Sequence, residues 1–121
     1  MLPLRLLDTS RVLNEDKSIS AVNFHGVSGY DSADILVAKD NKIFLIDNIW
    51  SYIEGDLAIA KILPTKDWHW MRFVVKSIKK NKLICQFRGQ TLNPNLYVEK
   101  TFSIFIDIDD GVMKVRVAEE K

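Results

Sequence analysis

Hydrophobic and polar residues alternate along most of this chain, which is the two-residue period of a β-strand. The alternation is clearest near the C-terminus, where two such runs flank Asp110-Gly111. Asp-Gly favours a two-residue type I′ turn, because both positions of that turn need a positive φ. A turn of this length predicts a hairpin with one apolar face. Its pairs are Ile108 with Met113, Ile106 with Val115, Ile104 with Val117, Asp107 with Lys114 and Phe105 with Arg116.

A second hairpin is predicted around Asp40-Asn41, another dipeptide that favours a two-residue turn. Val37 then lies opposite Phe44, and Leu36 lies opposite Leu45. Both faces of these two strands are apolar, a pattern that is typical of strands covered on both sides.

The segments 68–78 and 83–88 form a third predicted hairpin around the basic stretch from Lys79 to Lys82. A two-residue loop would split the apolar faces of the two strands. A three-residue loop from Lys80 to Lys82 instead places Val75 opposite Phe87 and Ser77 opposite Cys85. We therefore expect the longer loop, with Asn81 or Lys82 in the left-handed conformation.

The remaining segments have weaker patterns. LRLL (4–7) and ISAVNF (19–24) are expected to be strands on either side of a polar turn from Asn14 to Lys17. In the segment 48–63, Ile49, Ile53, Leu57 and Ala60 would line one face of a helix. Gly55 and Asp56 favour a short helical turn followed by a strand from Leu57 to Leu63, which Pro64 would end.

These elements predict an all-β fold with at most one short helix, and a single domain over residues 1–121. Sequential hairpins favour an antiparallel meander that forms a small closed or partly open barrel. A two-sheet β-sandwich is the alternative.

Composition agrees with a globular domain, since 47% of the residues are hydrophobic and 27% are charged. Cys85 is the only cysteine and falls on an apolar strand face, where a thiol is inert. No internal disulfide can form, which favours a reducing, cytoplasmic location. Pro3 and Arg5 interrupt the N-terminal apolar stretch, so we expect no signal peptide, and no run is long enough to span a membrane.

The net charge of +1 gives no overall attraction to nucleic acid or to anionic lipid. The charge is unevenly distributed along the chain, however. Between residues 66 and 90, seven basic side chains accompany Asp67 alone, so this segment carries a charge of about +6.

The stretch DWHWMRF (67–73) lies inside this basic segment and is the main candidate for a site. The pleat of a regular strand places three of its side chains and the following Lys76 on one face, and the predicted hairpin register adds two from the next strand. The predicted binding face therefore consists of Trp68, Trp70, Arg72, Lys76, Gln86 and Arg88. The alternative is that the tryptophans pack beneath a loop or against another subunit.

No other motif predicts catalysis, a cofactor or a metal. Asp107, Asp109 and Asp110 belong to a hairpin and match no calcium-loop spacing. His25 and His69 form no ligand pattern, and we interpret the G-x-x-G of residues 26–29 as a loop.

These observations favour a non-catalytic binding or assembly module whose partner is another protein or a second copy of the chain. Single-stranded nucleic acid, bound by the same face, is the alternative. A barrel that encloses a small apolar ligand is a third hypothesis. An enzyme that uses His25 or His69 with a carboxylate brought close by the fold is a fourth.

Overall fold

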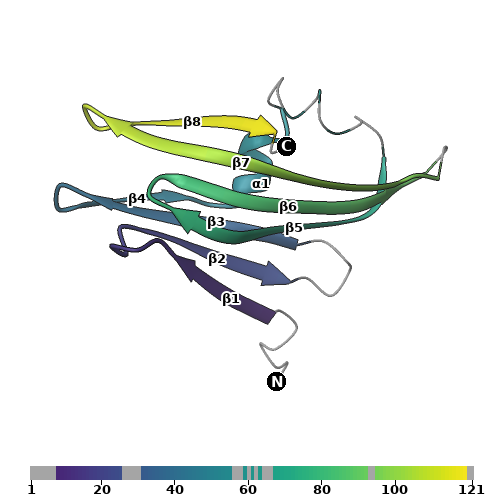
Figure 1. The fold of residues 1–121 in the computed structure, drawn as a ribbon, viewed down its shortest axis with the longest axis horizontal. Coiled ribbons are helices and arrows are strands. Elements are labelled where there is room, and N and C mark those ends of the chain that lie inside the picture. The colour runs from purple at the N-terminus through teal and green to yellow at the C-terminus, as the bar shows by residue number, and fades with distance from the viewer. Residues whose placement is uncertain are drawn as a thin grey trace.

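The computed structural model describes residues 8–25, 31–55, 59, 61, 63, 67–92 and 95–119. These residues form two four-stranded antiparallel sheets, and each sheet is a meander of consecutive strands (Figure 1). The first sheet contains β1 (Asp8–Leu13), β2 (Ile19–His25), β3 (Asp31–Lys39) and β4 (Lys42–Ile46). The second contains β5 (Trp68–Lys79), β6 (Lys82–Thr91), β7 (Tyr97–Asp109) and β8 (Val112–Glu119). The predicted all-β fold is confirmed.

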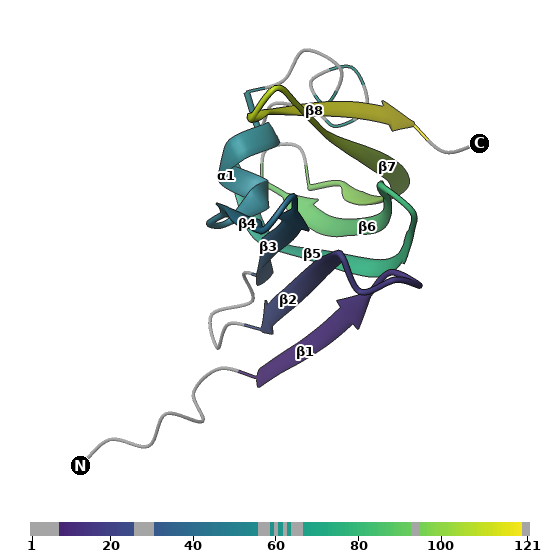
Figure 2. The ribbon, with the colours of Figure 1, turned by 90° about the vertical axis from the view of Figure 1, so that its left-hand side faces the viewer.

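The sheets do not close into a barrel, so the closed barrel expected from sequential hairpins is wrong and the two-sheet alternative fits. The short helix α1 (Ile49–Ile53) lies between β4 and β8 (Figure 2). Its buried Trp50 approaches Phe73 and Phe87 with ring centroids 5.6 and 5.1 Å away. The helix therefore packs its Trp50 side chain against residues of β5 and β6.

The two hairpins with favourable turn residues have the predicted registers. Ile106 pairs with Val115 in one, and Val37 pairs with Phe44 in the other. All four turn residues have positive φ angles: Asp40, Asn41, Asp110 and Gly111. The local chemistry of the turn therefore determines the register, as expected.

The β5–β6 hairpin differs from the prediction. Its loop has two residues, Lys80 and Asn81, and Lys80 has a φ of 55°. A β-bulge at Lys76 then shifts the register, so that Val75 pairs with Cys85 and Phe73 pairs with Phe87. The expected three-residue loop is wrong because the extra residue lies within the strand, where a bulge realigns the apolar faces equally well.

The segment that follows β4 is helical over its described part. Asn48 caps α1, since its side chain accepts a hydrogen bond from the Ser51 amide. Further on, the Leu63 amide donates to the Ile59 carbonyl at 2.8 Å, which is the spacing of a helix. The strand predicted from Leu57 to Leu63 is therefore wrong at those two residues. Residues 56–58, 60 and 62, like the strand predicted at 4–7 and the G-x-x-G at 26–29, lie outside the described residues.

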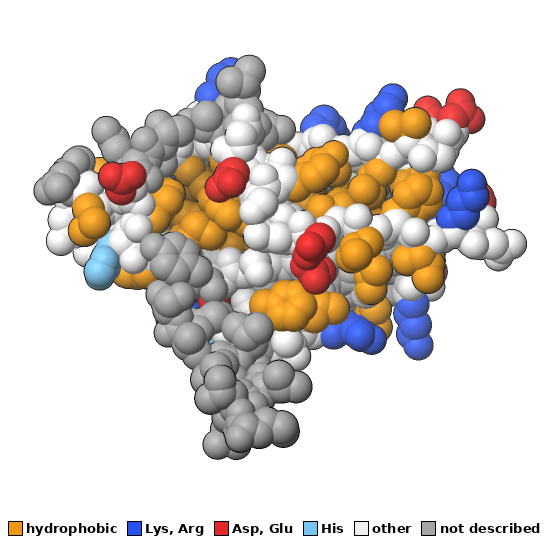
Figure 3. Space-filling model, turned by 180° about the vertical axis from the view of Figure 1, so that it is seen from behind, with side chains coloured by type: hydrophobic (Ala, Val, Ile, Leu, Met, Phe, Trp, Pro, Cys, Tyr) orange, Lys and Arg blue, Asp and Glu red, His pale blue; other side chains and the backbone are white. Residues whose placement is uncertain are grey.

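The outer face of β3 and β4 is apolar but not covered, contrary to expectation. Ile43 is 75% exposed and Leu45 is 58% exposed. Figure 3 shows hydrophobic side chains gathered on the side of the molecule where β4 lies. Alternation alone cannot distinguish a face that packs within the chain from one that faces outward.

A buried amide joins the two sheets. The Asn23 side chain, from β2, donates to the Val75 carbonyl and accepts from the Val75 amide, both at 3.0 Å. Val75 lies on β5, an edge strand of the second sheet. The side chain of Asn23 thus takes the place of a neighbouring strand, and the edge of β5 lies against the inner face of the first sheet.

Candidate interaction surface

A second bulge in β5 separates the two tryptophans of DWHWMRF. Trp68 pairs with Thr91 and Trp70 pairs with Gln90, which leaves His69 as the extra residue. One residue between two strand positions normally keeps them on the same face, but a bulged residue reverses this relation. The expectation that Trp68 and Trp70 share a face is therefore wrong.

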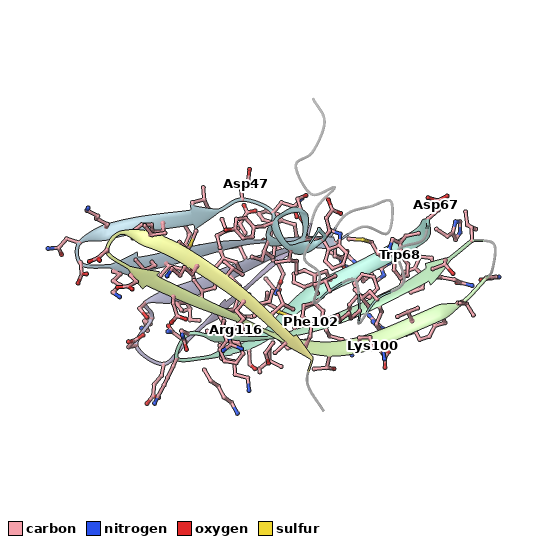
Figure 4. All side chains as sticks on the ribbon, turned by 90° about the horizontal axis from the view of Figure 1, so that it is seen from above. Asp47, Asp67, Trp68, Lys100, Phe102 and Arg116 are labelled. Carbon is pink, nitrogen blue, oxygen red and sulfur yellow. The ribbon has the colours of Figure 1, made fainter. Side chains whose placement is uncertain are left out.

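Trp68 packs toward the core at the end of β5 that lies away from the β7–β8 turn (Figure 4). Its ring meets Phe87 edge-on, with centroids 4.9 Å apart. It also covers Gly89 so closely that a Cβ atom there would lie 2.9 Å from the ring. Trp68 is thus a packing residue and not part of an exposed platform.

The outer face of β5, β6 and the start of β7 retains most of the other predicted residues. Cross-strand pairing joins Trp70 to Gln90, Arg72 to Arg88 and Gln90 to Tyr97. Lys76 is exposed at its bulge and has no partner in the strand ladder. We call the following set the Trp70 face: Trp70, Arg72, Gln86, Arg88, Gln90 and Tyr97.

Contacts within this face hold Trp70 in place while leaving it partly exposed. Its indole Nε1 donates to the Gln90 Oε1 at 3.2 Å. The Tyr97 ring lies 6.2 Å away, centroid to centroid, and the Arg72 guanidinium carbon lies 6.0 Å from the indole centroid. Gln90 also donates to Asn95. An aromatic side chain fixed in this way loses little conformational entropy when it binds a partner.

The exposed apolar area extends beyond Trp70 toward the β6–β7 connection. Tyr97 is 57% exposed, and the neighbouring Leu92 and Leu96 are about half exposed. The Tyr97 hydroxyl donates to Glu99 Oε2 at 2.9 Å, and this bond raises the pKa of Tyr97, while Arg88 acts in the opposite direction. The Tyr97 hydroxyl is therefore held as a neutral donor.

Arg72 also reaches a buried carboxylate that the sequence pattern did not reveal. Asp31 lies at the start of β3 with its side chain only 2% exposed, and its Oδ1 is 3.6 Å from Arg72 Nη1. His25 Nδ1 lies 3.0 Å from the same oxygen, and His25 Nε2 lies 2.7 Å from Arg72 Nη1. None of these contacts gives Asp31 Oδ1 a well-directed hydrogen bond. The sequence does contain one sign of this contact. The charged Asp31 stands at a β3 position that the alternation of the strand predicts to face inward.

The His25–Asp31 pair is the contact that an acid–base site would need, but its surroundings do not complete one. The Nε2 atom, which would exchange a proton with a substrate, contacts Arg72. Among the described residues, no hydroxyl or thiol is hydrogen-bonded to His25, and no group of three potential metal ligands occurs. We therefore assign His25 and Asp31 to positioning Arg72.

The other sequence candidates have structural roles. Asp107 accepts from the Asn81 side chain at 2.6 Å and pairs with Lys114 across the hairpin. Cys85 is fully buried, and burial raises the pKa of its thiol. A groove of about 770 Å³ lies where the hairpin turns meet, and its rim is polar, with Asn14, Asp16, Lys39 and Lys80 among its lining residues. Ile19 and Val37 of the first sheet and Ile106 and Ile108 of the second also line it, so the groove lies between the two sheets at this end.

No helix in the described part of the chain is both long and apolar enough to cross a membrane. The chain matches no family model, and neither a curated protein nor a solved structure shows significant similarity to it.

Proposed function

We propose that this chain is a protein-binding module and that the Trp70 face is its contact surface. The observation that carries the proposal is the pair Trp70 and Tyr97, two aromatic side chains that remain accessible on a rigid sheet. Exposed leucines extend the apolar area, and Arg72 and Arg88 lie beside it. Tryptophan, tyrosine and arginine are the residues most enriched at the energetic centres of protein interfaces.

The charges around this face favour a protein over single-stranded nucleic acid. A stacking platform with successive aromatic rings would need both tryptophans, and Trp68 packs in the core. The positive charge of Arg72 lies close to Asp31, and Glu99 pairs with Arg88 across the strands. A phosphate chain running over the aromatic side chains would lie close to the exposed Glu99, and the charge of Arg72 is already balanced in part by the buried Asp31.

Affinity capture with matched variants tests the proposal. Immobilised wild-type protein, Trp70→Ala and Tyr52→Ala are compared in extracts of the source cells with and without nuclease treatment. Tyr52 is the control because it is also an exposed aromatic residue, on α1 and away from the face. We expect Trp70→Ala to weaken binding of a captured protein by about 2 kcal/mol, as loss of an aromatic anchor does, and Tyr52→Ala to leave binding unchanged.

Three results would contradict the proposal. Equal capture by all three proteins would remove the Trp70 face from the interface. Binding that disappears on nuclease treatment would support nucleic acid instead. A loss of roughly 3–5 kcal/mol of folding stability in Trp70→Ala would show that Trp70 is a core residue.

A further inference from the structure

We propose that the partner of the Trp70 face is an acidic protein segment, one carboxylate of which binds between Arg72 and Arg88; this rests on the proposed function. The two arginines lie directly opposite each other on β5 and β6, with their side chains on the same face. Like charges at directly opposed positions destabilise a sheet. An anion bound between the two guanidinium groups is attracted by both and offsets their mutual repulsion.

The environment of the two guanidinium groups leaves one of them available. Arg72 is turned toward His25 and Asp31, which hold it at the edge of β5. Arg88 is exposed; its side chain interacts with the Tyr97 hydroxyl and lies opposite Glu99, and it remains accessible to solvent. Arginine binds carboxylates through two parallel hydrogen bonds, so an incoming carboxylate can be recognised by Arg88 and approached by Arg72 from the neighbouring strand.

The residues around the two arginines favour a carboxylate that belongs to a segment with both apolar and acidic side chains. Trp70 lies beside Arg72, and Tyr97 lies beside Gln90, so side chains next to the carboxylate meet aromatic rings. Beyond Arg88, the cross-strand neighbour is Glu99, and at the edge of β5 Arg72 lies close to the buried Asp31 of the first sheet. Single negative charges fit between these two carboxylates, whereas a continuous line of negative charges would be repelled by them.

The test measures binding of defined probes to the purified full chain by fluorescence anisotropy at low and at physiological salt. The probes carry fluorescein and are an eight-residue peptide that alternates leucine and glutamate (the acidic peptide), the same peptide with glutamine in place of glutamate, and an eight-nucleotide oligothymidine. We expect the acidic peptide to bind at least about tenfold more tightly than the other two, and Arg88→Gln to weaken it about tenfold, as loss of a charge-assisted hydrogen bond does. The matched control is Arg11→Gln, which removes an exposed arginine from β1 in the other sheet and should leave binding unchanged.

Arg88→Gln is the decisive variant because Arg88 is exposed and contacts no buried charge. Arg72→Gln should give a similar loss of binding, and a thermal melt shows whether removing the partner of Asp31 also affects folding. Equal binding of the acidic peptide to wild type and Arg88→Gln would overturn the inference, and so would tighter binding of the oligothymidine. If Trp70→Ala abolishes capture while Arg88→Gln preserves it, the proposed function stands and only the acidic partner fails.

Discussion

At the scale of single residues, Gly89 and Trp68 fit together because glycine has no side chain. A Cβ atom at position 89 would lie 2.9 Å from the indole of Trp68 and 3.1 Å from the ring of Phe87. Both rings belong to the packed interior and cannot move far. This contact explains how a bulky tryptophan at the start of β5 can turn inward without displacing the neighbouring strand.

We predict that Gly89→Ala lowers the free energy of unfolding by about 1–3 kcal/mol, the usual cost of overpacking. The control is Gly55→Ala, since a Cβ atom there meets nothing within 4 Å. That change should leave stability the same or raise it by less than about 1 kcal/mol. Urea unfolding of both variants measures the difference, and equal stability of the two would contradict the assigned contact.

Cys85 should be unreactive in the folded protein. Burial raises the pKa of its thiol, so the reactive thiolate is absent at neutral pH. A thiol reagent at pH 8 should label the native chain slowly and the urea-unfolded chain quickly, whereas an Ala38→Cys variant, at an exposed position, should label quickly when native. Above about pH 8.5 the unfolded thiol ionises while the folded one stays neutral, so Cys85 lowers stability as pH rises. Rapid native labelling of wild type would place Cys85 at the surface.

At the scale of elements, the two bulges of β5 determine which side chains reach the surface. The bulge at Lys76 realigns the apolar residues of β5 and β6, and the bulge at His69 turns Trp68 inward. A regular strand over residues 68–79 would have placed both tryptophans outside. The binding surface therefore depends on backbone irregularity as much as on residue type.

The backbone of the β5–β6 turn is strained at Lys80. Lys80 has a φ of 55°, a left-handed conformation that costs a residue with a side chain about 1 kcal/mol compared with glycine. We predict that Lys80→Gly increases the free energy of unfolding by up to about 1 kcal/mol. The backbone carbonyl of Lys80, which accepts from Asn14, is retained in this variant.

The matched control is Asp40→Gly in the β3–β4 turn, where φ is also positive. Aspartate tolerates this conformation better than lysine does, so the gain in stability should be smaller. Denaturant midpoints measured for both variants give the comparison. A loss of stability in Lys80→Gly would mean that the lysine side chain itself stabilises the turn.

At the scale of the whole molecule, the two sheets are joined by polar contacts as well as by the core. Asn23 completes the hydrogen bonding of Val75, and the Asn14 side chain donates to the Lys80 carbonyl at 2.9 Å. Lys39 extends from the first sheet to the Ile108 carbonyl of β7. These contacts fix how the second sheet lies against the first, and so where Arg72 meets Asp31.

We predict that Asn23→Ala destabilises the fold by about 2–4 kcal/mol, because the buried amide and carbonyl of Val75 each lose their partner. Amide exchange at Val75 should become faster at the same time. The control is Asn95→Ala, which removes an exposed asparagine that contacts only a neighbouring side chain among the described residues. Unchanged amide exchange at Val75 would show that the Asn23 side chain does not stabilise this contact between the two sheets.

The sequence alone determined the elements whose information is local. The Asp110-Gly111 and Asp40-Asn41 turns predicted both registers, since a two-residue turn leaves one way to align the flanking strands. Alternating side chains predicted the all-β class and the burial of Cys85. Arg72, Gln86 and Arg88 share a face as expected, because the bulge at Lys76 shifts the register by one residue, as the predicted three-residue loop would have done.

Only the tertiary structure decided the features that depend on distant residues. A bulge follows from what the neighbouring strand and the core require, so the inward turn of Trp68 could not be predicted from DWHWMRF. Asp31 meets Arg72 across 41 positions of chain, a distance at which sequence patterns carry no pairing information. The separation into two sheets also appears only in the folded molecule, where β4 and β5 do not pair and Trp50 of the intervening α1 packs against Phe87 of β6. Local sequence fixes turns and faces because those energies are local, whereas packing between sheets depends on which side chains the whole chain brings together.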